Sequence, residues 1–95
     1  MKVCHITSVH SRYDLRILYK ECISLHKAGY DVFLVVNDKR QNEIIDGVKI
    51  ISTGKEASNR ISRMINSVNW VYREAVKIGA DVYHLHDHDD RDGLP

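Results

Sequence analysis

The sequence predicts an α/β fold in which helices pack against a mainly parallel sheet. Two apolar runs, at 2–6 and 31–36, flank a stretch with helical periodicity, which is the pattern of a strand–helix–strand unit. A second amphipathic stretch is followed by another strand-like run, "DVYHLH", at 81–86. The chain has 95 residues, 43% of them hydrophobic and 28% charged, so we expect one folded domain with a small core.

The first unit covers residues 2–36. The run "KVCHI" is expected to form the first strand, and Gly29 to end the helix that follows it. The run "DVFLVV" at 31–36 is continuously apolar, which is typical of a central strand covered on both faces. Cys4 and Cys22 fall at apolar positions and are expected to be buried thiols rather than a disulfide. The apolar face of the helix is formed by Leu15, Leu18, Tyr19, Cys22, Leu25 and His26.

Residues 48–86 add a strand, a helix and a last strand. The run "VKIIS" at 48–52 is expected to be an edge strand. A helix is expected between Ser58, a suitable N-cap, and Gly79, a suitable stop. Its apolar positions are Ile61, Met64, Ile65, Val68, Val71, Tyr72, Ala75 and Val76. With right-handed crossovers, these elements predict a Rossmann-like three-layer sandwich with a mainly parallel sheet of order 3-2-1-4.

In an open sheet of this kind, ligands bind beyond the carboxyl ends of the strands. The loop after the first strand, residues 7–14, contains neither G-x-G-x-x-G nor G-x-x-x-x-G-K-[ST], which argues against a dinucleotide or P-loop site. Ser11 and Asp14 have the spacing of a capping box, so Asp14 either caps the following helix or contacts a substrate. Arg16 either contacts a substrate or is a solvated charge on the surface of the first helical turn. The second candidate segment starts at His86.

The segment "HSRYDLRILYKECISLHKAGYDV", residues 10–32, resembles the amino-terminal segment of family 4 glycosyltransferases with the GT-B fold. The members that it resembles assemble bacterial capsule and cell-surface polysaccharides. In that pattern a His opens the loop, an Asp and an Arg follow, and "K-E-x-x-S-L-x-x-x-G-Y-x-V" comes next. The likeness continues through "DGVKII" at 46–51 and "ADVYHLHD" at 80–87.

This resemblance implies the amino-terminal, acceptor-side part of a retaining glycosyltransferase. Such an enzyme transfers a sugar from a nucleotide-sugar donor to a glycan or lipid-linked acceptor. The resemblance implies a catalytic role for His86, at the mouth of the cleft near the donor sugar. No cofactor and no metal ligand are expected. The implied substrate-binding residues are His10, Asp14, Arg16 and Asp87.

The alternation of side chains along a strand supports part of this assignment independently. It places His84 and His86 on the same face, with His86 nearer to the carboxyl end. His84 is therefore expected to be packed or hydrogen-bonded within the domain.

Residues 88–95, "HDDRDGLP", depart from the family, which usually continues "H-x-H-D-P-E" toward a second domain with the nucleotide-sugar site. We therefore expect an incomplete GT-B amino-terminal domain over 1–87, a polar His/Asp tail over 88–95, and no activity without the carboxy-terminal domain. The last strand would then leave a sheet edge at Val82, Tyr83 and Leu85 through which copies of the chain could associate.

Two other interpretations stay open. His84, His86 and the tail offer many potential metal ligands, although their order fits neither a binuclear metallohydrolase motif nor an EF-hand loop. Loose binding of transition metals by the tail is a weaker form of the same hypothesis. A small flavodoxin-like binding module is the third possibility, but it would need acidic residues directly after the first strand, where this chain has "HITSVHS".

Charge and targeting signals narrow the class of partner. The 14 basic and 13 acidic side chains are scattered and leave a net charge of +1, which argues against a nucleic-acid partner. The N-terminus has no apolar run of signal-peptide length. We therefore expect a cytoplasmic protein, with peripheral membrane association of a full-length enzyme as an alternative.

Overall fold

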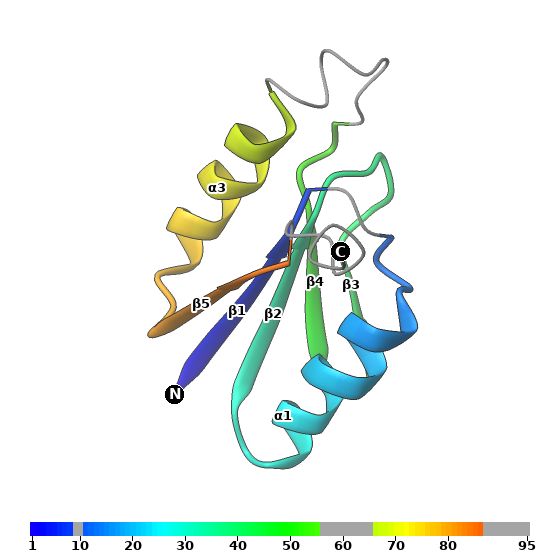
Figure 1. Ribbon diagram of the computed structural model, residues 1–95, viewed down its shortest axis with the longest axis vertical. Coiled ribbons are helices and arrows are strands. Elements are labelled where there is room, and N and C mark those ends of the chain that lie inside the picture. Colours follow the sequence, from blue (N-terminus) through cyan, green and yellow to red (C-terminus); the bar gives the residue numbers. More distant parts are fainter. Residues whose placement is uncertain (9–10, 56–65, 87–95) are drawn as a thin grey trace, which may run out of the picture.

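The computed structural model describes residues 1–8, 11–55 and 66–86 and contains a five-stranded sheet with a helical layer on each face (Figure 1). The strands are β1 (Lys2–Thr7), β2 (Asp31–Val36), β3 (Glu43–Ile45), β4 (Val48–Ser52) and β5 (Val82–Leu85). Their order in the sheet is β3-β4-β2-β1-β5. β1 pairs in parallel with β2 and β5, and β2 with β4, whereas β3 is antiparallel to β4.

The α/β class is confirmed, but the four-strand, mainly parallel sheet of order 3-2-1-4 is not what forms. The sheet is mixed and has a fifth strand, so β4 lies inside the sheet instead of at its edge. The missed strand β3 has only three residues in a polar stretch, too few to produce a periodic pattern. The sequence did contain a signal for the turn between β3 and β4, because Asp-Gly is typical of a tight hairpin. Asp46 and Gly47 form this turn, with φ of 47° and 88°.

The first helix begins with a wide π-helical segment, η1 (Leu15–Cys22), and continues as α1 (Ile23–Lys27). The backbone N–H of Ile23 donates to the carbonyl oxygen of Leu18, five residues earlier. This wider turn changes which side chains face the sheet. The buried residues are Ile17, Leu18, Cys22 and Ile23, which repeat every five positions.

The expected apolar face of this helix is therefore only partly correct. Leu18 and Cys22 are buried, and Leu25 is half-buried. Leu15 and Tyr19, in contrast, are 70% and 45% exposed. The three- and four-residue spacing assumed an ordinary α-helix, whereas a π-helical segment rotates successive side chains by a smaller angle.

The second helix, α3 (Ser67–Ile78), buries Val71 and Ala75 against the sheet and ends at Gly79. Gly79 adopts the left-handed conformation at φ 65°, as expected of a helix stop. Tyr72 and Val76 were expected to be buried but are 40% and 72% exposed, because they lie on the outer side of the helix. Val68 is half-buried, and the remaining positions of this prediction, Ser58, Ile61, Met64 and Ile65, lie outside the described residues.

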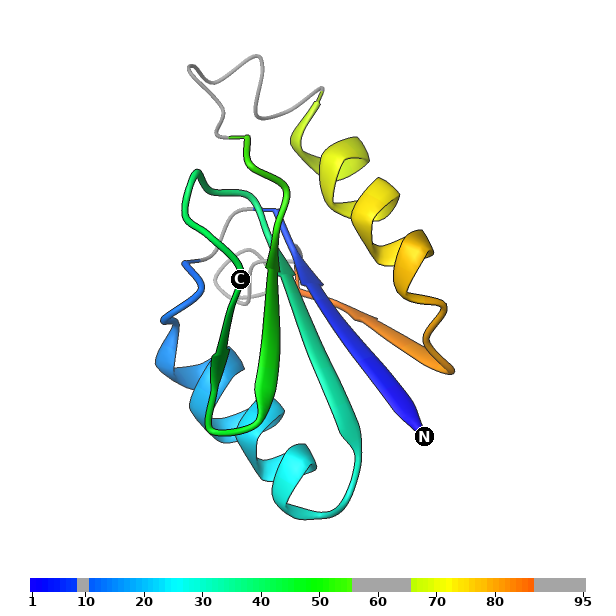
Figure 2. The same ribbon diagram turned by 180° about the vertical axis from the view of Figure 1, so that it is seen from behind.

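The two helical layers cover opposite faces of the sheet, as the front and back views show (Figures 1 and 2). Along β2, Val32, Leu34 and Val36 pack with η1 and α1, whereas Val35 packs with α3. This alternation produces one apolar core on each face, as a strand buried on both sides requires. Cys4 and Cys22 are buried and unpaired, which confirms the expectation for both thiols, and burial raises the pKa of each to about 12.

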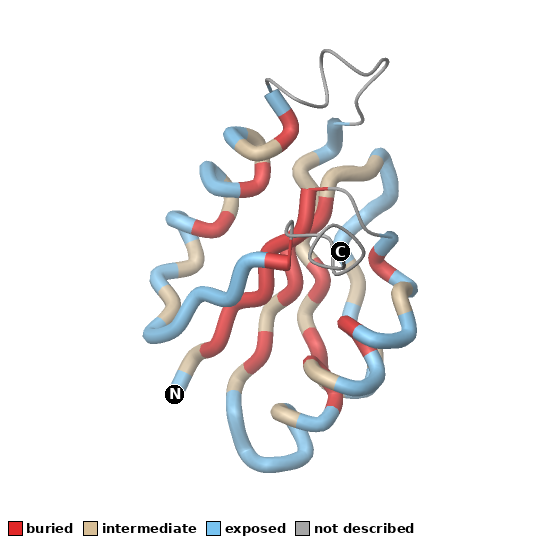
Figure 3. The backbone as a smooth tube through the Cα atoms, viewed as in Figure 1, coloured by how far each residue is buried: buried red, intermediate tan, exposed pale blue. Residues whose placement is uncertain are grey.

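β5 differs from the other parallel strands because it lies at the edge of the sheet. Its residues Val82, Tyr83 and Leu85 are 42–44% exposed, while β1 is buried along most of its length (Figure 3). Within the part of the chain that the structure describes, no helix has the length and apolar character needed to cross a membrane.

Candidate functional site

Three histidines come together where β1 and β5 run side by side. The parallel register places His84 directly opposite His5, and the backbone N–H of His86 donates to the carbonyl oxygen of Ile6 at 2.7 Å. Because side chains alternate along a strand, all three imidazoles lie on the same face of the sheet. The pairing of two distant strands thus creates a polar patch beside the apolar core under η1.

Glu21 from η1 completes this group, which we call the histidine cluster: His5, Glu21, His84 and His86. One ligand atom from each of these four residues lies within 4.8 Å of all the others. Glu21 Oε1 is 3.8 Å from His86 Nε2 and 3.9 Å from His84 Nδ1. The helix therefore brings a carboxylate to the imidazoles that the strands align.

The closest contact in the histidine cluster joins His5 Nδ1 and His86 Nε2 at 2.7 Å. At this distance one nitrogen carries the proton and donates it to the other. The rings of His84 and His86 stack with centroids 4.2 Å apart, and His5 stacks on His86 at 4.9 Å. The three rings consequently direct several nitrogen atoms into one small volume.

Burial strongly affects His5, whose side chain is 1% exposed. Desolvation, together with the nearby His86 and His84, lowers the pKa of His5 from 6.5 to about 4. His5 is therefore uncharged near neutral pH. Its second ring nitrogen, Nε2, is buried and has no hydrogen-bond partner among the described residues, which is uncommon in folded proteins.

The site residues predicted from the sequence do not all lie in the histidine cluster. His86 belongs to the histidine cluster and is 8% exposed. His84 was expected to be packed or hydrogen-bonded within the domain, and its ring contacts those of His5 and His86, although its side chain is 54% exposed. Asp14 caps the helix, because its Oδ1 accepts hydrogen bonds from the backbone N–H groups of Arg16 and Ile17.

Asp14 therefore performs the structural role that the sequence left open, although not through a capping box. The Ser11 hydroxyl oxygen accepts a bond from the backbone N–H of Tyr13 instead. Arg16 is exposed in the first turn of the helix and is not part of the histidine cluster. His10 and Asp87 lie outside the described residues.

Two members of the histidine cluster, His5 and Glu21, were missed by the sequence analysis. The position of His5 could have been predicted, because His5 lies in the first strand, and that strand was expected to pair with the last one. Same-face alternation on neighbouring strands would have placed His5 near His84. Glu21 had no such signal, since its position depends on the wide turn of η1.

A second polar group, the arginine cluster, lies on the loops beyond β1 and β2 and consists of Arg12, Asp38 and Glu43. The Arg12 guanidinium is 1% exposed and binds both carboxylate oxygens of Asp38, at 2.6 and 2.8 Å. It also donates to Glu43 Oε2 at 3.0 Å and to the carbonyl oxygen of Gln41 at 2.7 Å. This paired geometry is the strong form of an arginine–carboxylate interaction.

The pKa values of the arginine cluster follow from these contacts. Burial alone would raise the pKa of Asp38, but hydrogen bonds from Arg12 and Ser52 outweigh it, so the pKa of Asp38 is lowered. Hydrogen bonds from Tyr13 and Arg12 likewise lower the pKa of Glu43. Both carboxylates are therefore held in the charged form that Arg12 needs.

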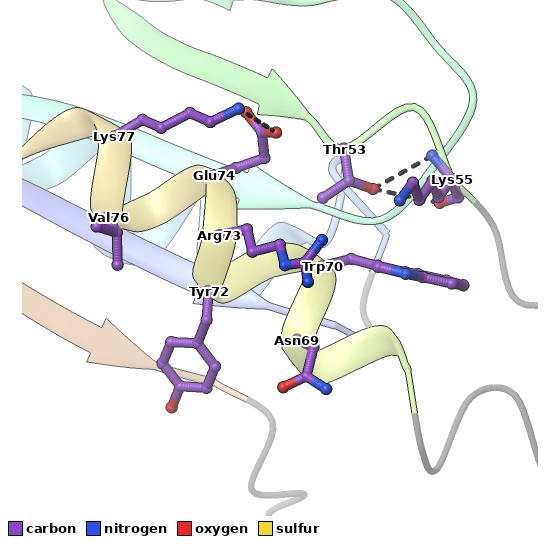
Figure 4. A pocket seen from close by; sticks show the side chains of 9 residues that line it. All are labelled: Thr53, Lys55, Asn69, Trp70, Tyr72, Arg73, Glu74, Val76 and Lys77. Carbon is purple, nitrogen blue, oxygen red and sulfur yellow. Dashed lines mark hydrogen bonds and ion pairs between the residues drawn. The ribbon is translucent and has the colours of Figure 1, made fainter.

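A large groove is also present along α3. It has a volume of about 810 Å³ and is lined on one side by Trp70, Arg73 and Lys77 (Figure 4). Lys55 approaches from the end of β4, with its ammonium group 5.6 Å from the centre of the Trp70 ring. None of the histidine cluster residues lines this groove. The size of the groove therefore does not connect it with the polar residues at the carboxyl ends of the strands.

Comparisons of the chain with protein-family models, with curated proteins and with solved structures found no match.

Proposed function

We propose that this chain is the acceptor-side part of a GT-B glycosyltransferase that uses a nucleotide-sugar donor. The observation that carries the proposal is the position of His86, directly after β5 and hydrogen-bonded through its backbone to β1. That position is at the carboxyl edge of parallel strands, where α/β sheets bind their ligands. The resemblance to family 4 enzymes assigns the transfer step to the same place.

His86 is held in a defined orientation by its neighbours, which is what a residue beside a reacting sugar requires. His5 fixes the Nε2 side of the ring through the 2.7 Å contact, and His84 stacks on its face. Fixed groups lower a reaction barrier because they need no reorganisation when the substrate reacts. In this proposal His86 is the catalytic residue and His5 is a positioning residue.

The start of η1 supplies the second half of the proposed site. Asp14 ties down the first backbone N–H groups of the helix, and Arg16 is exposed in the turn that follows. The guanidinium group of an arginine suits a phosphate group, because it can donate two parallel hydrogen bonds to it. We assign Arg16 to the donor phosphate or the acceptor and Asp14 to holding the loop. His10 and Asp87 remain proposed substrate contacts.

The proposal is tested by measuring sugar transfer from UDP- and GDP-linked hexoses, using the product of the complete reading frame that contains this chain. His86→Ala should lower kcat by about 100-fold, the size expected when a positioned group at the reacting centre is lost. The melting temperature should also fall, because the variant leaves the buried Nδ1 of His5 without its partner, so kcat is measured well below the melting transition of both proteins.

His26→Ala is the matched control, because it removes a histidine that is outside the histidine cluster. It should leave transfer unchanged. Full transfer activity of the His86→Ala variant, or no nucleotide-sugar consumption by the wild type, would refute the proposed function.

A further inference from the structure

We propose that the histidine cluster is a binding site for one divalent transition-metal ion of the Zn²⁺ type, with His5, Glu21, His84 and His86 as its ligands. This inference does not rest on glycosyl transfer, because it uses only the mutual positions of these four side chains. The preferred interpretation of the sequence assigned no metal ligand, and its metal-binding alternative combined His84 and His86 with the polar tail instead of His5 and Glu21.

The distances between the ligand atoms suit a small tetrahedral ion. With metal–ligand bonds of about 2.0–2.1 Å, neighbouring ligand atoms lie about 3.3–3.4 Å apart. The His5–His86 nitrogens are slightly closer, at 2.7 Å, and Glu21 Oε1 is slightly farther, at 3.8 Å from His86 and 3.9 Å from His84. Shifts of about half an ångström in each contact reach the tetrahedral spacing.

The types of ligand select the class of metal. Three imidazole nitrogens and one carboxylate oxygen favour Zn²⁺ and its neighbours Co²⁺ and Ni²⁺, whereas Mg²⁺ and Ca²⁺ prefer oxygen ligands throughout. One carboxylate among neutral ligands is also a common composition of zinc sites. The histidine cluster is therefore suited to a transition metal and not to an alkaline-earth ion.

The fold supports these ligands rigidly on one side and leaves access on the other. His5 is fully buried in β1, and His86 is held by the backbone bond between β5 and β1. His84 and Glu21, with side chains 54% and 32% exposed, face solvent. An ion can therefore enter from the exposed side and meet nitrogen atoms that the sheet already holds in place.

The contact between His5 and His86 points to the same conclusion. His5 is 1% exposed, and its Nδ1 meets Nε2 of another imidazole at 2.7 Å. Two imidazole nitrogens at this distance share a single proton. A bound cation would be a partner of opposite kind for both nitrogens at once.

The test is a metal titration of the 95-residue chain after treatment with EDTA. ZnCl₂ titrated by calorimetry should bind with one ion per chain, and CoCl₂ should produce the intense visible bands of a four-coordinate complex. MgCl₂ should not bind. His84→Ala and Glu21→Gln should each weaken Zn²⁺ binding at least tenfold. The fold should survive, because His84 is exposed and Glu21→Gln keeps the shape of a half-buried side chain.

Two control variants separate the histidine cluster from other histidines. His26→Ala removes a histidine on α1, and His88→Ala removes one from the polar tail; neither should change the affinity. Absence of Zn²⁺ binding, or binding that persists in the His84→Ala and Glu21→Gln variants and disappears in His88→Ala, would overturn the proposal. Because no nucleotide sugar is present, this outcome is independent of the proposed transferase activity.

Discussion

The arginine cluster and the histidine cluster are both largely buried polar groups, but they are built on opposite principles. In the arginine cluster a single cation, Arg12, meets two carboxylates through short, directed bonds. In the histidine cluster three like groups stack on each other and share one hydrogen bond, and a buried nitrogen has no partner among the described residues. The first arrangement stabilises the fold by itself, whereas the second gains its full stability only with a ligand.

This contrast separates structural from functional polar residues within one small domain. Complementary charges with satisfied donors need no further explanation, because pairing alone accounts for them. An incompletely satisfied group of like residues is typical of a functional site, where stability is given up for binding. The three predictions below test this difference.

The largest expected effect is the loss of Arg12. Arg12→Met leaves Asp38 and Glu43 without their cation and should lower the free energy of unfolding by about 3 kcal/mol. This is the lower end of the range for breaking a buried pair, since the Glu43 side chain is 36% exposed and can be solvated. Urea denaturation at pH 7 measures the change.

Arg40→Met is the matched control for this experiment. Arg40 is exposed, and its side chain lies over the Tyr13 ring at 5.5 Å, so its loss should change stability by less than about 0.5 kcal/mol. Equal effects of the two replacements would show that the arginine cluster contributes no more than a surface contact.

The next effect is the pH dependence of the histidine cluster in metal-free buffer. The unfolded chain takes up a proton on His5 near pH 6.5, whereas the folded pKa is about 4. Between these values the unfolded state binds more protons, so stability should fall as the pH decreases from 6.5 to 4. The full difference between pKa 6.5 and about 4 corresponds to about 3.4 kcal/mol, of which roughly 2.5 kcal/mol is lost by pH 4.5.

Urea midpoints at pH 7.5 and pH 4.5, both in EDTA, measure this loss. The His5→Leu variant should lose much less stability over the same interval, because the depressed titration has been removed. The arginine cluster contributes little over this interval, because the lowered pKa values of Asp38 and Glu43 place the loss of their stabilisation below their ordinary values of 3.8 and 4.5. An unchanged acid loss in His5→Leu would contradict the assignment to His5.

The smallest expected effect is the replacement of both hydrogen-bonded histidines. The double variant His5→Leu/His86→Leu removes a donor and its acceptor together, which is often close to neutral when both sites are apolar afterwards. The free energy of unfolding at pH 7.5 without metal should change by less than about 1 kcal/mol. A loss as large as that of Arg12→Met would mean that the histidines are a structural pair and not a functional one.

The sheet shows where reasoning from the sequence reached its limit. Long elements with strong patterns, such as the continuous apolar run of β2 and the stop of α3 at Gly79, were predicted correctly. The three-residue strand β3 was missed, and with it the correct sheet order. The predicted buried faces of both helices were partly wrong. In the first helix, the π-helical segment changes the rotation per residue; in α3, apolar side chains also lie on the outer side.

The sequence by itself determined the α/β class, the burial of both cysteines and the placement of His84 and His86 on one face of the last strand. These features depend on local periodicity, which is written in neighbouring residues. Only the tertiary structure brought His5 and Glu21 to that pair and Asp38 to Arg12. Such contacts depend on strand register and on the pitch of η1, and those are decided by the packing of segments far apart in the chain.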